Sequence, residues 1–172
     1  MLQTADTPLF ETKVLREYTL RLVRQGLTSS AFLLVACSSG DPTGVPNPSL
    51  DSEVGQFVLL ANEHRASVGC PALSWNEPLA GVAQGHSDDM VRRGFFSHTN
   101  PDGDSPGDRL ESAGFQWSRW AENIAAGQPT GEAVLDGWLG SPGHRANLEN
   151  CLLTHHGVGL ADRHWTHVFM SP

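Results

Sequence analysis

The chain reads Phe-Phe-Ser-His-Thr-Asn-Pro-Asp-Gly at residues 95–103, Ala-Glu-Asn-Ile-Ala at 121–125 and Ser-Pro-Gly-His-Arg-Ala-Asn-Leu at 141–148. Each stretch contains one ionisable group: His98, Glu122 or His144. The sequence around it is rich in Gly, Pro, Asn or Ser, or reads as the end of a helix or strand, which is typical of loops. Imidazole and carboxylate groups together can ligate a metal, position a water or transfer a proton. The three stretches therefore define the candidate site.

These motifs, in this order, resemble the bacterial branch of the CAP superfamily (cysteine-rich secretory, antigen 5 and pathogenesis-related-1 proteins). The resemblance runs from about Phe57 to the C-terminus and implies an α+β fold, a three-layer α-β-α sandwich of the CAP/SCP type. It also implies a central cleft. By motif, His98 matches the first cleft histidine, Glu122 the glutamate and His144 the second histidine.

The second cleft acid of animal and plant members has no counterpart in this chain. Trp138 is followed by Leu-Gly-Ser-Pro, and Ser141 falls where similar bacterial sequences have serine. Resemblance implies a divalent metal, zinc or copper, on His98 and His144 in some members. Two histidines make an incomplete zinc site, since zinc takes three or four protein ligands. The other interpretation is a buried hydrogen-bond network that holds the loops together.

Local patterns predict helices and antiparallel strands that do not alternate as βαβ units. This mixture independently favours an α+β layered domain. Capping residues and stop glycines predict helices over about 52–68, 76–93, 106–113 and 130–139, and strands over 121–125, 157–160 and 165–169.

Several other polar residues invite a functional interpretation. We expect His86 to be a satisfied core histidine and Asp108-Arg109 to brace a helix end. We expect Phe95 and Phe96 to anchor the His98 loop in the core, Arg145 and Asn147 to fix the His144 loop, and His155, His156 and His164 to be solvated in turns. His167 lies on the same strand face as Trp165 and Phe169 and is left unassigned.

The N-terminal segment predicts export. Residues 1–36 contain arginines followed by an apolar run too short for an ordinary membrane span, as in a secretory signal. Leu-Val-Ala-Cys at 34–37 resembles a bacterial lipobox, which predicts lipidation of Cys37, a flexible tether over 37–50 and a domain over 51–172. The alternatives are a plain signal peptide or an apolar patch in a cytosolic tail. Because the charged stretch before the apolar run is over-long, we expect translation to begin downstream of Met1.

Cys70 and Cys151 are the two cysteines left in the predicted domain. An exported domain with two cysteines favours a disulfide between them, the alternative being two separate buried thiols. Bacterial CAP domains similar to this one often carry such a pair.

The net charge of −8 disfavours nucleic acid as a partner, because phosphate binding depends on clustered Lys and Arg. We expect a monomeric, exported module of the cell envelope, held at a membrane through its lipid anchor, that binds a small apolar ligand or a protein partner. The alternative is a metal-dependent hydrolase with metal on His98 and His144 and Glu122 as general base.

Overall fold

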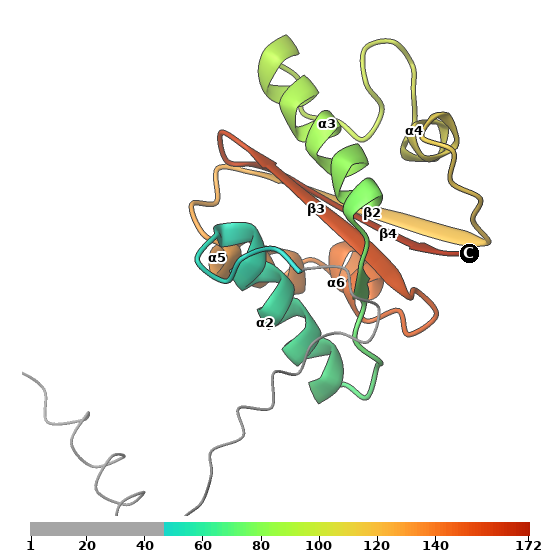
Figure 1. Ribbon diagram of the computed structural model, residues 1–172. Coiled ribbons are helices and arrows are strands. Elements are labelled where there is room, and N and C mark those ends of the chain that lie inside the picture. The colour runs from blue at the N-terminus through green and yellow to red at the C-terminus, as the bar shows by residue number, and fades with distance from the viewer. Residues whose placement is uncertain (1–46) are drawn as a thin grey trace, which may run out of the picture. The chain divides into compact units, whose positions relative to one another are not determined.

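A four-stranded sheet organises residues 47–172, the part of the chain that the computed structural model describes (Figure 1). The strands are β1 (Ser74–Trp75), β2 (Arg119–Ala126), β3 (His155–Ala161) and β4 (His164–Ser171), in the spatial order β1-β3-β4-β2. The β3–β4 and β2–β4 pairs are antiparallel, and β1 pairs with β3 in parallel. This order leaves β2 at an edge. The predicted signal segment 1–36, Cys37 and the tether up to residue 46 lie outside the described residues.

Helices cover both faces of this sheet, so the predicted three-layer α-β-α sandwich is confirmed. One face carries α2 (Glu53–Ser67), α5 (Gly131–Leu139) and α6 (Pro142–Leu148), and the other carries α3 (Glu77–Arg93) and α4 (Pro106–Ser112) (Figure 1). Each face has its own apolar cluster, one around Phe57 and Trp138 and the other around Leu79 and Leu110. None of the helices within residues 47–172 combines the length and apolarity needed to cross a bilayer.

The predicted helix starts are confirmed by their caps. Side chains of Ser52, Asn76, Ser105 and Thr130 each accept a hydrogen bond from a backbone N–H in the first turn. Ser105 forms a reciprocal capping box with Asp108, which satisfies two otherwise unpaired donors. A strand missed by the sequence analysis, β1, is only two residues long and lacks any alternation to reveal it.

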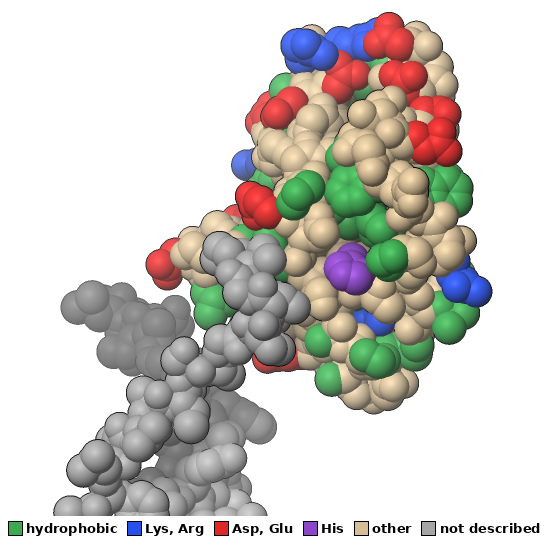
Figure 2. All heavy atoms as spheres, turned by 45° about the vertical axis from the view of Figure 1, so that its right-hand side comes forward, with side chains coloured by type: hydrophobic (Ala, Val, Ile, Leu, Met, Phe, Trp, Pro, Cys, Tyr) green, Lys and Arg blue, Asp and Glu red, His purple; other side chains and the backbone are tan. Residues whose placement is uncertain are grey.

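Two glycines of β3 bring α3 directly onto the sheet. A Cβ at Gly157 would lie 2.2 Å from the backbone nitrogen of Ala80, and one at Gly159 would lie 2.3 Å from that of Gln84. No side chain fits at these distances, so the α3 backbone rests on the strand itself. The far end of α3 is tied to the following loop by the ion pair of Arg93 with Asp102, and Figure 2 shows side chains of both charges gathered at that end of the molecule.

The hairpin between β3 and β4 is tighter than the sequence predicted. Its loop is Asp162-Arg163, with positive φ at both residues (41° and 60°), as a two-residue turn of the primed type requires. β3 also begins two residues earlier than predicted.

The prediction that His156 is solvated is therefore wrong. His156 lies within β3, is fully buried, and its Nδ1 is 3.0 Å from Nε2 of the equally buried His167. The His167 ring packs against Phe57 and Phe169 in the core beneath α2, at centroid distances of 5.0 and 3.7 Å. Strand pairing with β4 places this histidine pair inside the domain, where the ring of His167 lies 5.8 Å from that of Trp138.

The predicted disulfide between Cys70 and Cys151 is confirmed, and it joins residues 81 positions apart. Beside it, the fully buried Arg65 guanidinium donates to four backbone carbonyls, of Pro71, Leu148, Asn150 and Leu153. The disulfide and Arg65 thus fix the same junction between the end of α2 and the segment that follows α6.

Candidate functional site

The candidate site is built around the edge strand β2, whose neighbouring side chains alternate between the two faces of the sheet. Glu122 pairs across the sheet with Val168, on the face covered by α3 and α4. Asn123 pairs with His167, on the face covered by α2, α5 and α6. Two consecutive residues therefore reach both sides of one exposed edge.

Glu122 is a buried carboxylate with both oxygens engaged. Oε1 accepts from Nδ1 of His98 at 2.8 Å, and Oε2 accepts from Nη2 of Arg109 at 2.6 Å. The glutamate side chain has no exposed surface. A carboxylate can be buried at modest cost when a cation and further donors satisfy it, and Arg109 supplies that cation.

Arg109, in α4, is the residue whose role at the site the sequence analysis missed. Besides Glu122, its Nη1 donates to the carbonyl oxygen of His98 at 2.8 Å and to that of Asp104 at 3.1 Å. It therefore positions both the cleft carboxylate and the loop that carries His98. The sequence indicates only a bracing role at a helix end, because the reach of Arg109 to Glu122 depends on how α4 packs against β2.

His98 presents its ring to solvent while Glu122 holds one edge of it. Its side chain is 48% exposed, and Nδ1 is the nitrogen bonded to the carboxylate. Nε2 is thus the atom left to meet a ligand.

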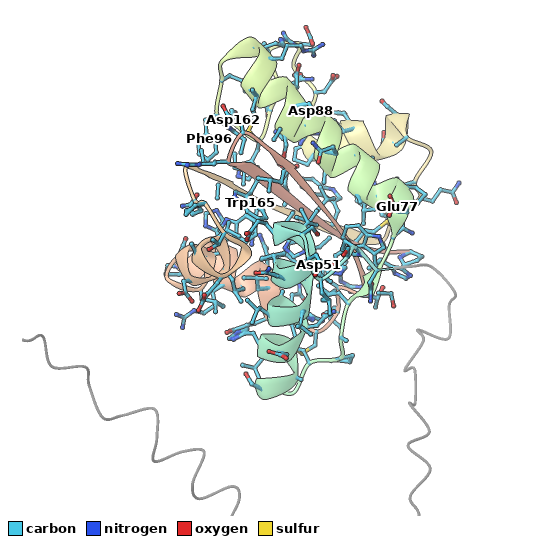
Figure 3. All side chains as sticks on the ribbon, turned by 60° about the vertical axis from the view of Figure 1, so that its left-hand side comes forward. Asp51, Glu77, Asp88, Phe96, Asp162 and Trp165 are labelled. Carbon is cyan, nitrogen blue, oxygen red and sulfur yellow. A yellow bond between two sulfur atoms is a disulfide. The ribbon has the colours of Figure 1, made fainter. Side chains whose placement is uncertain are left out.

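The predicted anchoring of the His98 loop by two aromatics is half correct. Phe95 is partly buried, with its ring centroid 5.8 Å from that of His86. Phe96 is 54% exposed and lies outside, beside the β3–β4 hairpin near Asp162 (Figure 3), with its ring 6.4 Å from that of His164.

His144 lies on the other side of β2, in the first turn of α6. Its backbone carbonyl accepts from the Asn123 amide at 3.1 Å, and its ring centroid lies 6.4 Å from that of Trp138. Partial burial lowers the pKa of His144, and the nearby charge of His98 lowers it further. The neutral imidazole, the form able to ligate or to accept a hydrogen bond, is therefore favoured.

Two polar side chains keep α6 in place. Asn147 donates to Oδ1 of Asn123 at 2.8 Å, and Arg145 Nε donates to the carbonyl of Leu139 at 2.6 Å. Both residues hold the His144 helix. Ser141, which stands where the second acid would fall, makes no side-chain cap bond to that helix.

The donor set offers a metal ion fewer groups than a resident zinc site needs. The two imidazoles can each present one nitrogen, but Glu122 is already bonded to His98 and Arg109. Across residues 47–172, no three His, Cys, Asp or Glu side chains converge closely enough to hold a metal. Zinc takes three or four protein ligands, and His98 and His144 supply two.

The family model for the cysteine-rich secretory protein (CAP) family matches residues 58–168, which include all the elements of this site. The chain belongs to the CAP family. This match confirms the resemblance found in the three motifs.

Relatives in Bacillus subtilis strain 168 support the assignment. The chain is 40% identical over 116 residues to the uncharacterized membrane protein YlbC, a match that covers 67% of this chain and 34% of that protein. It is 34% identical over 146 residues to the uncharacterized protein YkwD, covering 84% of this chain and 56% of that protein. The CAP chain thus matches about a third to somewhat over half of the length of these relatives.

Solved structures show the same fold. An extracellular protein with an SCP domain from Bacillus anthracis superposes with a TM-score of 0.69 at 39% identity, covering 71% of this chain and 41% of that one. An outer surface protein of Borrelia burgdorferi gives a TM-score of 0.64 at 20% identity, covering 69% of this chain and 92% of that one. The second match shows that this fold can constitute almost an entire chain.

Proposed function

We propose that this CAP protein is a non-enzymatic binding module of the cell envelope, whose ligand or protein partner docks on the cleft between His98 and His144. The observation that carries the proposal is the engagement of both oxygens of Glu122, which are bonded to His98 and Arg109. A general base must reach the proton it removes. A carboxylate fixed between two donors is suited instead to orienting an imidazole.

The cleft offers a binding surface that is preorganised by neighbouring groups. Glu122 and Arg109 hold the His98 loop, and Asn123 with Asn147 holds the helix of His144. The two imidazoles therefore meet a ligand with little loss of conformational freedom, which favours affinity.

Attachment to a membrane through Cys37 is part of the same proposal. The apolar run and the lipobox at residues 34–37 support it. The matched proteins include one named as a membrane protein and one named as an outer surface protein. Mass spectrometry of the mature protein tests it: a diacylated N-terminal Cys37 supports the anchor, and an unmodified mature N-terminus at another residue contradicts it.

The metal-dependent hydrolase is the weaker candidate. It needs a third ligand beside His98 and His144 and an unoccupied base, and the described residues supply neither. No reaction step follows from this geometry.

Calorimetric titration with zinc and with copper separates the two candidates. The protein is compared with the double variant His98→Ala/His144→Ala, and with His155→Ala/His164→Ala as a control that removes two other partly exposed histidines. The binding module predicts only weak binding, above micromolar dissociation constants, that the first pair loses and the control keeps. A micromolar or tighter site at His98 and His144, accompanied by ester or peptide hydrolysis that Glu122→Gln abolishes, would overturn the proposal.

A further inference from the structure

A groove of ≈ 460 Å³ lies between α3, α4 and the loop that joins them. Its size lies in the range of small-molecule sites. The lining is charged but balanced, with Asp89, Asp102 and Asp104 set against the arginines at positions 92, 93 and 109. Figure 2 shows these two signs of charge together at the end of the molecule where α3 finishes.

The groove contains a buried histidine with an unused nitrogen. His86 is 2% exposed, and its Nε2 lies 2.9 Å from the carbonyl oxygen of Ser97. A carbonyl only accepts, so Nε2 carries the proton and Nδ1 is an acceptor. This Nδ1 is buried without a hydrogen-bond partner. Burial and the charge of Arg109 lower the pKa of His86, which keeps the ring neutral. The expectation that His86 is a satisfied core histidine is thus wrong for one of its nitrogens.

A donor on the facing helix is also unused. Nε of Arg109 is buried and without a partner, although both terminal nitrogens of the same guanidinium are bonded to Glu122 or to backbone carbonyls. Unsatisfied buried polar atoms are costly, so each one calls for a partner. His86 and Arg109 both line the groove, and each holds one buried polar atom without a partner, an acceptor in His86 and a donor in Arg109.

The floor of the groove is kept open by two helical glycines. Gly81 and Gly85 lie one turn apart on α3, both line the groove, and a Cβ at either would meet nothing within 4 Å. Glycine inside a helix costs roughly 1 kcal/mol relative to alanine. Gly157 and Gly159 are required by close backbone contacts, but Gly81 and Gly85 are not. The close approach of a ligand is a physical reason for a glycine at positions 81 and 85.

We propose that this groove is a second binding site, taking a neutral, hydroxyl-rich ligand the size of a sugar unit. A hydroxyl group can donate to an acceptor such as His86 Nδ1 and can accept from a donor such as Arg109 Nε, so hydroxyl groups suit both atoms. Three aspartates and three arginines leave the lining without net charge, which favours a ligand without net charge over a carboxylate, a phosphate or an ammonium ion.

The test is a titration of the ¹⁵N-labelled protein with glucose and N-acetylglucosamine, and with charged glucosamine and glucuronate as matched probes. The readouts are the His86 Nδ1 signal and the backbone amides of α3. The site predicts saturable shifts with at least one neutral sugar at millimolar concentration and smaller ones with the charged analogues. Shifts confined to residues outside the groove, or none with either neutral sugar, overturn it.

Gly85→Ala provides the decisive variant because it should not impair folding. The new methyl group enters open space and the helix gains stability, but the methyl occupies the groove. Gly137→Ala, in α5, is the matched control, since its Cβ would meet only Gln128 at 3.7 Å. The site predicts that Gly85→Ala weakens sugar binding by about tenfold, equivalent to ~1.4 kcal/mol, while Gly137→Ala leaves it unchanged. Equal binding by the two variants, or one ordered water that bridges His86 and Arg109 in a crystal soaked with the sugar, would show that water alone satisfies the groove.

Discussion

Glu122 and Asn123 are neighbours on β2, yet they bind the segments that carry His98 and His144 on opposite faces of the sheet. The carboxylate accepts from His98 and Arg109 on one face of the sheet, and the amide binds the backbone of His144 on the other. β2 is an edge strand, and its alternating side chains bind elements of both helical layers. The placement of His98 and His144 therefore depends on the sheet order as well as on the three motifs.

Replacing Glu122 should destabilise the fold as well as change the cleft. Glu122→Ala leaves the guanidinium of Arg109, 12% exposed, without its carboxylate, and losing one partner of a buried ion pair costs about 3–5 kcal/mol. Glu122→Gln keeps the shape and one acceptor, so we expect the smaller loss of roughly 1–3 kcal/mol. Urea unfolding measures both.

The matched control for that series is Asp88→Asn, which neutralises an exposed carboxylate on α3. Surface substitutions of this kind change the free energy of unfolding by no more than about 0.5 kcal/mol. A Glu122→Ala variant as stable as Asp88→Asn would mean that the ion pair contributes nothing to the fold.

Arg65 should be among the most sensitive positions in the domain. It is fully buried, and its guanidinium bonds four carbonyls of the segments around the disulfide. Arg65→Met fills a similar volume but leaves those carbonyls unpaired, at about 1–3 kcal/mol for each that water cannot reach. We expect the free energy of unfolding to fall by several kcal/mol, or the variant to fail to fold, as measured by thermal unfolding.

The control Arg92→Met removes an arginine whose side chain is 74% exposed, and it should unfold at almost the wild-type temperature. Similar melting temperatures for the two variants would contradict the assigned role.

Local signals are enough to predict α2, α3, α4 and α5 and an α+β layered domain, whereas the three-layer sandwich is predicted by the family resemblance. Caps at Ser52, Asn76 and Thr130 are chemical features of a few adjacent residues, so they can be recognised without knowing the fold. Resemblance of motif predicts that His98, Glu122 and His144 share one cleft, and the structure brings the three to the same strand edge.

What could not be predicted depends on contacts between distant elements. Arg109 reaches Glu122 only because α4 packs against β2, and Arg65 finds carbonyls more than eighty residues away. The sequence favours a turn at His156 because the strand signal that follows it is short. Only Gly-Val-Gly-Leu, at residues 157–160, indicates the strand that buries this histidine. Glycines weaken a strand pattern, and here they serve close packing against α3.

The disulfide should contribute more than any single surface contact. The disulfide joins residues 81 positions apart, and the Cys70→Ser/Cys151→Ser variant removes this cross-link from the unfolded chain. Because the unfolded chain then gains conformational entropy, the free energy of unfolding should fall by about 4–5 kcal/mol. Guanidinium unfolding of wild type, with and without reductant, gives the size of the effect. Reductant should leave the double variant unchanged, which separates loss of the bond from general effects of the reagent. An unfolding midpoint in the wild type that does not respond to complete reduction would rule out this contribution.

The buried histidine pair makes the domain sensitive to acid. Burial lowers the pKa of His156 to about 3 and that of His167 well below its usual value. In the unfolded chain both titrate near 6.5, so between about pH 3 and pH 6.5 the unfolded state binds more protons than the folded one. The free energy of unfolding must then fall as pH falls, by up to roughly 1.4 kcal/mol per pH unit for each histidine, and it is unaffected by the pair above about pH 6.5.

The variant His156→Gln tests this dependence because it removes one titrating group and keeps a side chain that can bond to His167. Urea unfolding is measured between about pH 4.5 and 7. As pH falls, the free energy of unfolding should decline less steeply in His156→Gln than in wild type, with slopes that differ by about 1.4 kcal/mol per pH unit over the lower part of that range. His155→Gln is the matched control, one position away but only partly buried, and should retain the wild-type slope. Parallel slopes for wild type and His156→Gln would show that other groups determine the acid sensitivity.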